Sequence, residues 1–341
     1  MNRIETDLDG TAVSMKRPVR KFTMLSRTAD SLYWLARYME RSDFLARTVE
    51  AAQRLAALPR AYNQDGSEWE SALESSGAVE AYHAKYGAET NPDLVVDFLT
   101  FDVENASSIR NCLEAARTNA RSIRTALTAE MWDAINGAWL ELKQFEQNKP
   151  GQNEERERVS KFLDFVKQTS LGFDGAVIRT MLRDPSFWFS RLGLHTERAD
   201  NTARILDVKY HVLLPENEQV GGSLDYFQWT AILRAVSALT AYHWVYRENI
   251  KPWLVADLLI LRREMPRSLL FCYENIVQSL DSISQAYGRQ GQSQRIAHRT
   301  LAQLENTAIE ELFQSGLHEF VTQFLEDNNQ LGLAISEQYL V

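Results

Sequence analysis

The sequence predicts an all-α protein, a multi-helix bundle built from two homologous halves related by a pseudo-twofold axis. Three observations lead to this prediction. The chain of 341 residues contains only 15 glycines and 8 prolines, so it has few of the residues that interrupt helices. Apolar residues recur every three to four positions, and no convincing period-two alternation of a strand is present. Two blocks of sequence also occur twice, in the same order.

The first half predicts a series of helices that follows a polar leader. Residues 1–23 carry scattered charge, and we expect them to be flexible. From residue 32 to residue 58 the apolar period is helical, and Pro59 ends this helix. A later helix has Asn105 as its expected N-cap. The remaining helices of this half are predicted over 68–86, 92–102, 105–127, 128–147 and 153–169, with loops near 65–66 and 149–151.

The second half predicts a similar series of helices. Pro185 and Pro266 suit the first position of a helix, where the missing N–H would be unpaired in any case. A loop is expected near 215–222, where Pro and Gly occur together. The helices are predicted over 185–213, 224–249, 252–262, 265–290, 293–314 and 317–339.

The chain contains an internal duplication. Residues 92–114 and 252–274 share nine identities in 23 positions at a constant offset of 160, including Cys112 and Cys272. A second pair of blocks, 35–47 and 192–204, is related by an offset of 157. One small insertion reconciles the two offsets. We therefore expect halves of about 24–180 and 181–341 that pack into a single body, because each half alone would expose a large apolar face.

The second pair of blocks repeats the element E-R-x-D-x-x-x-R. On a helical wheel of about 100° per residue, Asp43 lies inside the apolar arc, Glu40 and Arg47 border it, and Arg41 points away. A carboxylate inside an apolar arc is costly unless it is paired, and Arg47 is the local partner of Asp43 at i,i+4. The second copy places Glu197, Arg198, Asp200 and Arg204 in the same way.

Two interpretations of this duplicated element remain open. In the first, the residues form a structural network of ion pairs that fixes helix register between the halves. In the second, the two copies meet in a polar site whose arginines bind a carboxylate or a phosphate. His195 lies close to the second copy and is an additional candidate for such a site, as a supporting group or as an acid or base.

The turn over residues 262–268 is a candidate anion-binding turn. It joins two predicted helices and places Arg267 and Ser268 in a first turn, where backbone N–H groups are free. The alternative interpretation is ordinary helix capping.

Composition excludes several classes of function. The net charge of −9 argues against a nucleic-acid role based on overall basic charge. No segment approaches the apolar length of a membrane span, and no secretory signal is recognisable, so we expect a cytoplasmic protein.

The two cysteines are predicted to be thiols packed in a core. No metal, phosphate-loop or dinucleotide motif is present, and a single Glu-x-x-His, Glu80 to His83, falls short of a di-iron set, so no metal or cofactor is predicted.

Several separated segments resemble the bacterial Alpha-E family, an α-helical domain family named for its Glu-Arg motif. The resemblance runs from about Met24 to the C-terminus, and the motif corresponds to Glu40–Arg41 and Glu197–Arg198. The segments that carry it are MLSRTADSLYWLARYMERSDFLAR, FDVENASSIRNCLEAARTNARSIR, FWFSRLGLHTERADNTARILDVKY and VADLLILRREMPRSLLFC.

The resemblance implies a partner function. Members of the family are typically encoded with circularly permuted ATP-grasp proteins or fused to them, and often lie near transglutaminase-like proteins. We therefore expect a helical accessory protein of an ATP-grasp-type amide or peptide ligase, which helps to bind or present substrate and has no catalytic activity of its own. The alternative is a cryptic enzyme, for amide transfer or metal-dependent chemistry, with its Glu/Asp/Arg site between the halves. A face exposed for a partner would serve equally for a homo-oligomer.

Overall fold

The computed structural model describes residues 24–58, 67–147, 155–211, 223–310, 312 and 316–340, and within these ranges it is helical without a strand. The all-α prediction is therefore confirmed for the described part of the chain. Five predicted features lie outside the described residues. They are the leader 1–23, the helix end at Pro59 and the loops at 65–66, 149–151 and 215–222.

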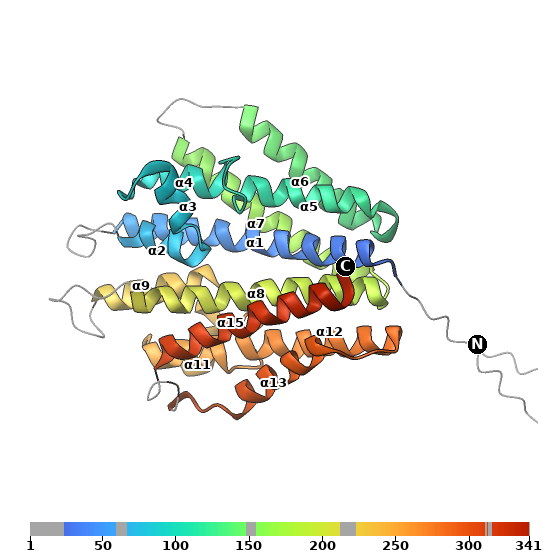
Figure 1. Ribbon diagram of the computed structural model, residues 1–341. Helices are drawn as coiled ribbons and strands as arrows, with labels where there is room; N and C mark the ends of the chain where they lie inside the picture. Colours follow the sequence, from blue (N-terminus) through green and yellow to red (C-terminus); the bar gives the residue numbers. More distant parts are fainter. Residues whose placement is uncertain are drawn as a thin grey trace, which may run out of the picture.

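Two long helices form the centre of the molecule. Helices α1 (Ser26–Ala56) and α8 (Pro185–His211) lie side by side, as Figure 1 shows in blue and yellow-green. Helices α5 (Ile109–Ser122) and α7 (Glu155–Thr180) pack on α1, whereas α12 (Leu269–Tyr287) and α15 (Leu317–Ile335) pack on α8. The apolar core follows these contacts, so α1 is surrounded by helices along most of its length.

Shorter helices complete the bundle. Helix α2 contacts α8 and helix α9 contacts α1, so each crosses to the other central helix. Helix α6 packs between α5 and α7, and α13 packs between α12 and α15. The bounds are α2 (Ser67–Ser76), α3 (Val79–Tyr86), α4 (Pro92–Thr100), η2 (Arg124–Ala126), α6 (Ala129–Gln147), α9 (Ser223–Ala235), α10 (Leu239–Tyr246), α11 (Pro252–Ile260), α13 (Gln292–Asn306) and the π-helical η3 (Ser336–Leu340).

Two helices predicted as continuous are broken. The segment predicted over 68–86 divides into α2 and α3 at Gly77, where φ is 65°. The segment predicted over 224–249 divides into α9 and α10 at Ser237, where φ is 56°. A positive φ cannot continue a right-handed helix, so the chain turns a corner at each position.

Two helix starts also differ from the prediction. Ser108 and Ser268 are the N-caps of α5 and α12, and their hydroxyls accept hydrogen bonds from the amides of Asn111 and Phe271. Asn105 is therefore not the cap of α5. Pro266 lies in the turn before α12 and not at its first position, whereas α8 does begin at Pro185. Helix α7 continues to Thr180, beyond its predicted end at 169.

Candidate functional site

The two Glu-Arg motifs meet between α1 and α8 and pair with each other. Arg198 on α8 donates from Nε and Nη2 to Oε1 and Oε2 of Glu40, at 3.0 and 2.8 Å. Arg41 on α1 donates from Nε and Nη2 to Oε1 and Oε2 of Glu197, at 2.5 and 3.2 Å. Each motif therefore supplies the bidentate partner of the other motif's glutamate, which is the strongest geometry for this ion pair.

Each glutamate also holds a second arginine. Arg267, from the turn before α12, donates from Nη1 to Oε1 of Glu40 at 2.7 Å. Arg37, one helical turn before Arg41, donates from Nε to Oε2 of Glu197 at 2.7 Å. Both glutamate side chains are only 2% exposed, so these arginines replace the water that each carboxylate loses on folding.

The two aspartates make the local pairs that the sequence predicts. Arg47 Nε lies 2.8 Å from Asp43 Oδ2, and Arg204 Nε lies 2.7 Å from Asp200 Oδ2. The Asp43 oxygen also accepts from Nη2 of Arg267 at 2.7 Å. The turn that sequence analysis proposes as an anion site therefore has its Arg267 side chain directed at two carboxylates of α1.

Arg47 and Arg204, the partners of the two aspartates, also contact the corners between shorter helices. Arg47 Nη1 donates to Ser237 Oγ at 2.6 Å, at the corner between α9 and α10. The guanidinium of Arg204 lies against Gly77, at the corner between α2 and α3. The polar residues between the central helices thus connect to both corners that the sequence failed to predict.

Electrostatics keep the two glutamates ionised. Burial alone would raise their pKa values, because it disfavours the charged form. Attraction and hydrogen bonds from Arg198 and Arg267 outweigh this effect and lower the pKa of Glu40 to about 2. Arg41 and Arg37 lower the pKa of Glu197 to about 2 in the same way.

His195 is separate from these ion pairs. Its side chain is fully buried, and Nε2 lies 2.8 Å from Nη2 of Arg191, so the imidazole is the acceptor. Burial and the positive charges of Arg191 and Arg198 lower the pKa of His195 well below its ordinary value. His195 is therefore neutral, and it makes no hydrogen bond with Glu197 or Asp200.

The two duplicated cysteines are buried beside the ion pairs. Burial raises the pKa of Cys112 and of Cys272 to about 12 in each case. Thiols with such pKa values remain protonated at neutral pH and are poor nucleophiles. Their packing role, predicted from the sequence, agrees with their complete burial.

Two arginines of the site have contacts that the sequence does not predict. One is Arg41, and the other is Arg37. The wheel directs Arg41 away from the apolar arc, yet its side chain reaches α8. The reason is that α1 is covered on several sides, so the side opposite the apolar arc is not simply solvent. Arg37 cannot be identified from the duplication, because its counterpart in the second block is Leu194 and the residue is therefore not repeated.

Ser268 serves as a cap. Its hydroxyl accepts from the Phe271 amide and donates to the carbonyl oxygen of Arg262 at 2.6 Å.

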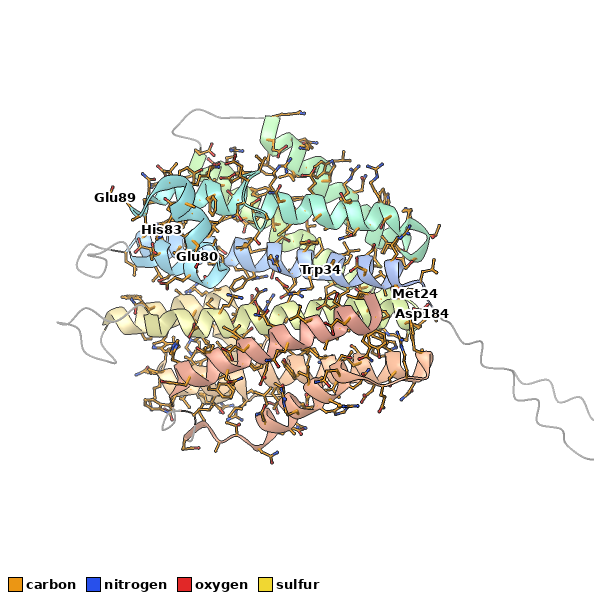
Figure 2. All side chains as sticks on the ribbon, in the orientation of Figure 1. Met24, Trp34, Glu80, His83, Glu89 and Asp184 are labelled. Atoms are coloured by element: carbon orange, nitrogen blue, oxygen red, sulfur yellow. The ribbon has the colours of Figure 1, made fainter. Side chains whose placement is uncertain are left out.

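Figure 2 labels Glu80 and His83, which lie together on α3 at one end of the molecule. Within the described ranges, no group of three or more His, Cys, Asp or Glu side chains could hold a metal ion. Among the described helices, none combines the length and the apolar character that a membrane-spanning segment requires.

Comparison with known proteins identifies one family. No curated protein and no solved structure matches the chain. The Alpha-E family, described as a predicted alpha-helical domain with a conserved ER motif, matches residues 24–340. The match covers nearly all of the chain and includes both Glu-Arg pairs. The chain therefore belongs to the Alpha-E family.

Proposed function

We propose that this Alpha-E protein is a non-catalytic helical partner of a circularly permuted ATP-grasp protein. In this role it helps to hold or present the substrate for ATP-dependent formation of an amide or peptide bond. A transglutaminase-like protein is a further candidate partner. The observation that carries the non-catalytic role is the mutual pairing of Glu40 with Arg198 and of Glu197 with Arg41, because it uses the motif to join α1 and α8. The choice of partner follows from membership of the Alpha-E family.

The chemistry of the buried groups supports a role without catalysis. A general acid or base works best when its pKa lies near the working pH, and a nucleophile needs an activating base. Glu40 and Glu197 have pKa values near 2 and are fully paired. The cysteines have raised pKa values, and neutral His195 accepts from an arginine.

We also infer that the chain arose by internal duplication, with α8 and the helices that follow it corresponding to α1 and the helices that follow that one. Helix contacts support this inference, since α1 packs on α5 and α7 as α8 packs on α12 and α15. The reciprocal Glu-Arg pairing is the relation expected at a pseudo-twofold axis. A heterologous partner would then meet two related surfaces, as would a second copy of the chain.

The cryptic-enzyme alternative requires a carboxylate that is free to act on a substrate. Each of the four motif carboxylates instead has at least one arginine within 3.0 Å. This pairing favours the partner function over the enzyme.

An affinity purification from the native cells tests the proposal. The full chain carries a C-terminal tag, a tag-only bait is the control, and recovered proteins are measured by mass spectrometry. Near-stoichiometric recovery of an ATP-grasp protein is the expected result, and it provides a ligase assay for motif variants. Recovery of the chain alone, or ATP-dependent ligation by the purified chain without a partner, would overturn the proposal.

A further inference from the structure

The polar residues between the central helices contain more positive than negative charge. Six guanidinium groups pair with four carboxylates, which leaves two positive charges in excess. An excess of buried charge is unfavourable unless an anion or water compensates it. The six arginines are Arg37, Arg41, Arg47, Arg198, Arg204 and Arg267, and the four acids are Glu40, Asp43, Glu197 and Asp200.

The excess divides between two clusters. Glu40 and Asp43 face the three arginines Arg47, Arg198 and Arg267. Glu197 and Asp200 face the three arginines Arg37, Arg41 and Arg204, and the charge of Asp200 acts on Arg37 as well as on Arg204. Each cluster therefore carries one unbalanced positive charge.

The cluster around Glu197 is the more open of the two. The side chains of Arg41 and Arg37 are 25% and 16% exposed, compared with 11–14% for the arginines around Glu40 and Asp43. Arg37 donates from Nε to Glu197 and from Nη1 to the hydroxyl of Tyr33. Among the described residues, no hydrogen bond is found for its Nη2. The exposed edge of this cluster therefore retains a donor and a net positive charge.

Aromatic rings fix the orientation of these arginines. The Cζ atom of Arg37 lies 4.7 Å from the ring centroid of Trp34, and the Cζ atom of Arg41 lies 5.9 Å from that of Tyr38. The two rings are 5.6 Å apart and half-buried, and Figure 2 labels Trp34 on α1 near the middle of the molecule. Stacking holds the guanidinium groups in place, so less conformational entropy is lost when they bind a ligand.

Helix α15 passes this edge at a glycine. A Cβ atom added to Gly332 would lie 3.9 Å from Nη1 of Arg37, so the helix approaches the guanidinium without a side chain between them. The other cluster differs at the matching positions. The counterpart of Trp34 on α8 is Arg191, which forms an ion pair with Asp174 of α7. The counterpart of Tyr38 is His195, which is fully buried.

We propose that Arg37 and Arg41, together with Trp34 and Tyr38, bind one oxyanion of a small ligand, a carboxylate or a phosphate. The oxyanion accepts hydrogen bonds at the exposed edge of the Arg37 guanidinium and compensates the unbalanced charge, and the aromatic rings contact the adjoining part of the ligand. This inference deepens the proposed function and rests on it for its biological meaning, since a partner that presents a substrate must hold it.

Calorimetric titration of the full chain tests the site without any ligase present. The probes are inorganic phosphate and N-acetylglycine, in separate titrations at low ionic strength. We expect one-to-one binding of at least one probe at millimolar concentration, and the two titrations distinguish a phosphate from a carboxylate. Arg37→Gln should weaken binding about tenfold or more, as expected when a charge-assisted hydrogen bond is lost.

Two further variants separate binding from folding. Arg54→Gln removes an exposed arginine from the same helix and should leave binding unchanged. Gly332→Met keeps every charge and covers the Arg37 edge, so it should also weaken binding about tenfold, even if Arg37→Gln does not fold. If neither probe binds the wild-type chain, or if Gly332→Met binds as tightly as wild type, the proposed site is wrong. Because no partner protein is used, these results are independent of the affinity purification.

Discussion

At the scale of single residues, the Glu-Arg motif solves a problem of buried charge. A carboxylate removed from water loses several kcal/mol of hydration, which only charges and hydrogen bonds of good geometry replace. Glu197 receives donors from two arginines and Glu40 receives them from two others. The same arrangement makes each pair sensitive, because removal of one partner leaves the other charge buried and unmatched.

Glu197→Gln should therefore destabilise the protein strongly. Arg37 and Arg41 would lose their shared carboxylate, and breaking a buried pair costs about 3–5 kcal/mol. Glu114→Gln is the matched control, because Glu114 is 47% exposed and its pair with Arg110 should contribute about 1 kcal/mol at most. Urea unfolding of both variants measures the difference. Equal free energies of unfolding would show that the buried ion pairs of Glu197 do not stabilise the protein more than an exposed pair does.

Both cysteines should be inert in the folded protein. Cys112 and Cys272 are fully buried, and their pKa values of about 12 leave almost no thiolate at neutral pH. Titration with a thiol-reactive disulfide reagent should detect no rapid reaction in buffer and two thiols in guanidinium chloride. Rapid labelling of either cysteine under native conditions would mean that the helices around the motif open readily.

At the scale of helices, the close approach of α1 and α8 depends on a glycine. A Cβ atom on Gly193 would overlap the carbonyl oxygen of Tyr33 on α1, and backbone atoms in two packed helices cannot move aside easily. Gly193→Ala should therefore force the helices apart and destabilise the protein by about 1–3 kcal/mol or more. The shift would also lengthen the ion pairs of the motif. Thermal and urea unfolding measure the effect.

Gly137→Ala is the matched control for this substitution. Gly137 also lies inside a helix, α6, but an added Cβ atom meets nothing within 4 Å. Alanine should stabilise this position by about 0.5–1 kcal/mol, because glycine loses more backbone entropy in a helix. If the two variants changed stability in the same direction, the close approach of α1 and α8 would not be what excludes a side chain at residue 193.

The long helices can be predicted from the sequence, whereas the corners between shorter helices cannot. Periodicity locates α1 and α8 because their buried residues recur at helical spacing over many turns. The corner at Gly77 carries a weak signal, since glycine tolerates positive φ. The corner at Ser237 carries none, because serine rarely adopts φ of 56° and its hydroxyl is held by Arg47, a contact distant in sequence.

The candidate site shows the same division between local and distant contacts. The pairs Asp43–Arg47 and Asp200–Arg204 follow from spacing on one helix, so the sequence predicts them. The exchange between Glu40 and Arg198 joins two helices, and a single helical wheel contains no information about which helix lies opposite. The role of Arg37 depends on the same packing and could not be predicted from the repeat.

At the scale of the whole molecule, the motif residues form a polar layer within an apolar core. Helices α1 and α8 carry most of this layer, and the remaining helices enclose it. An apolar interface would lose little stability if one helix slid along the other by a turn, whereas displaced ion pairs would leave the three buried carboxylates of Glu40, Asp43 and Glu197 without partners. We therefore expect the layer to fix the register of the two central helices, a role attested for buried polar groups in other helical assemblies.

The stability of the whole protein should depend on the ionisation of this layer. In the folded protein the pKa values of Glu40 and Glu197 are about 2, compared with 4.5 for an ordinary glutamate. Because the folded state binds protons more weakly, the stabilisation is complete above about pH 5 and is lost as the pH falls toward 2. Each shift corresponds to stabilisation on the order of 3 kcal/mol.

Urea unfolding at a series of pH values between neutrality and about pH 3 measures this dependence. The free energy of unfolding should decrease steadily below about pH 5 in the wild-type chain. In Glu40→Gln the layer has one fewer titrating carboxylate with a lowered pKa, so the variant should be less stable at neutral pH and lose less stability on acidification. Glu114→Gln should follow the wild-type curve, since no such buried pair is removed. If Glu40→Gln and the wild-type chain lost stability in parallel, the acid sensitivity would have to arise outside the polar layer, and the Glu-Arg pairs would not be its source.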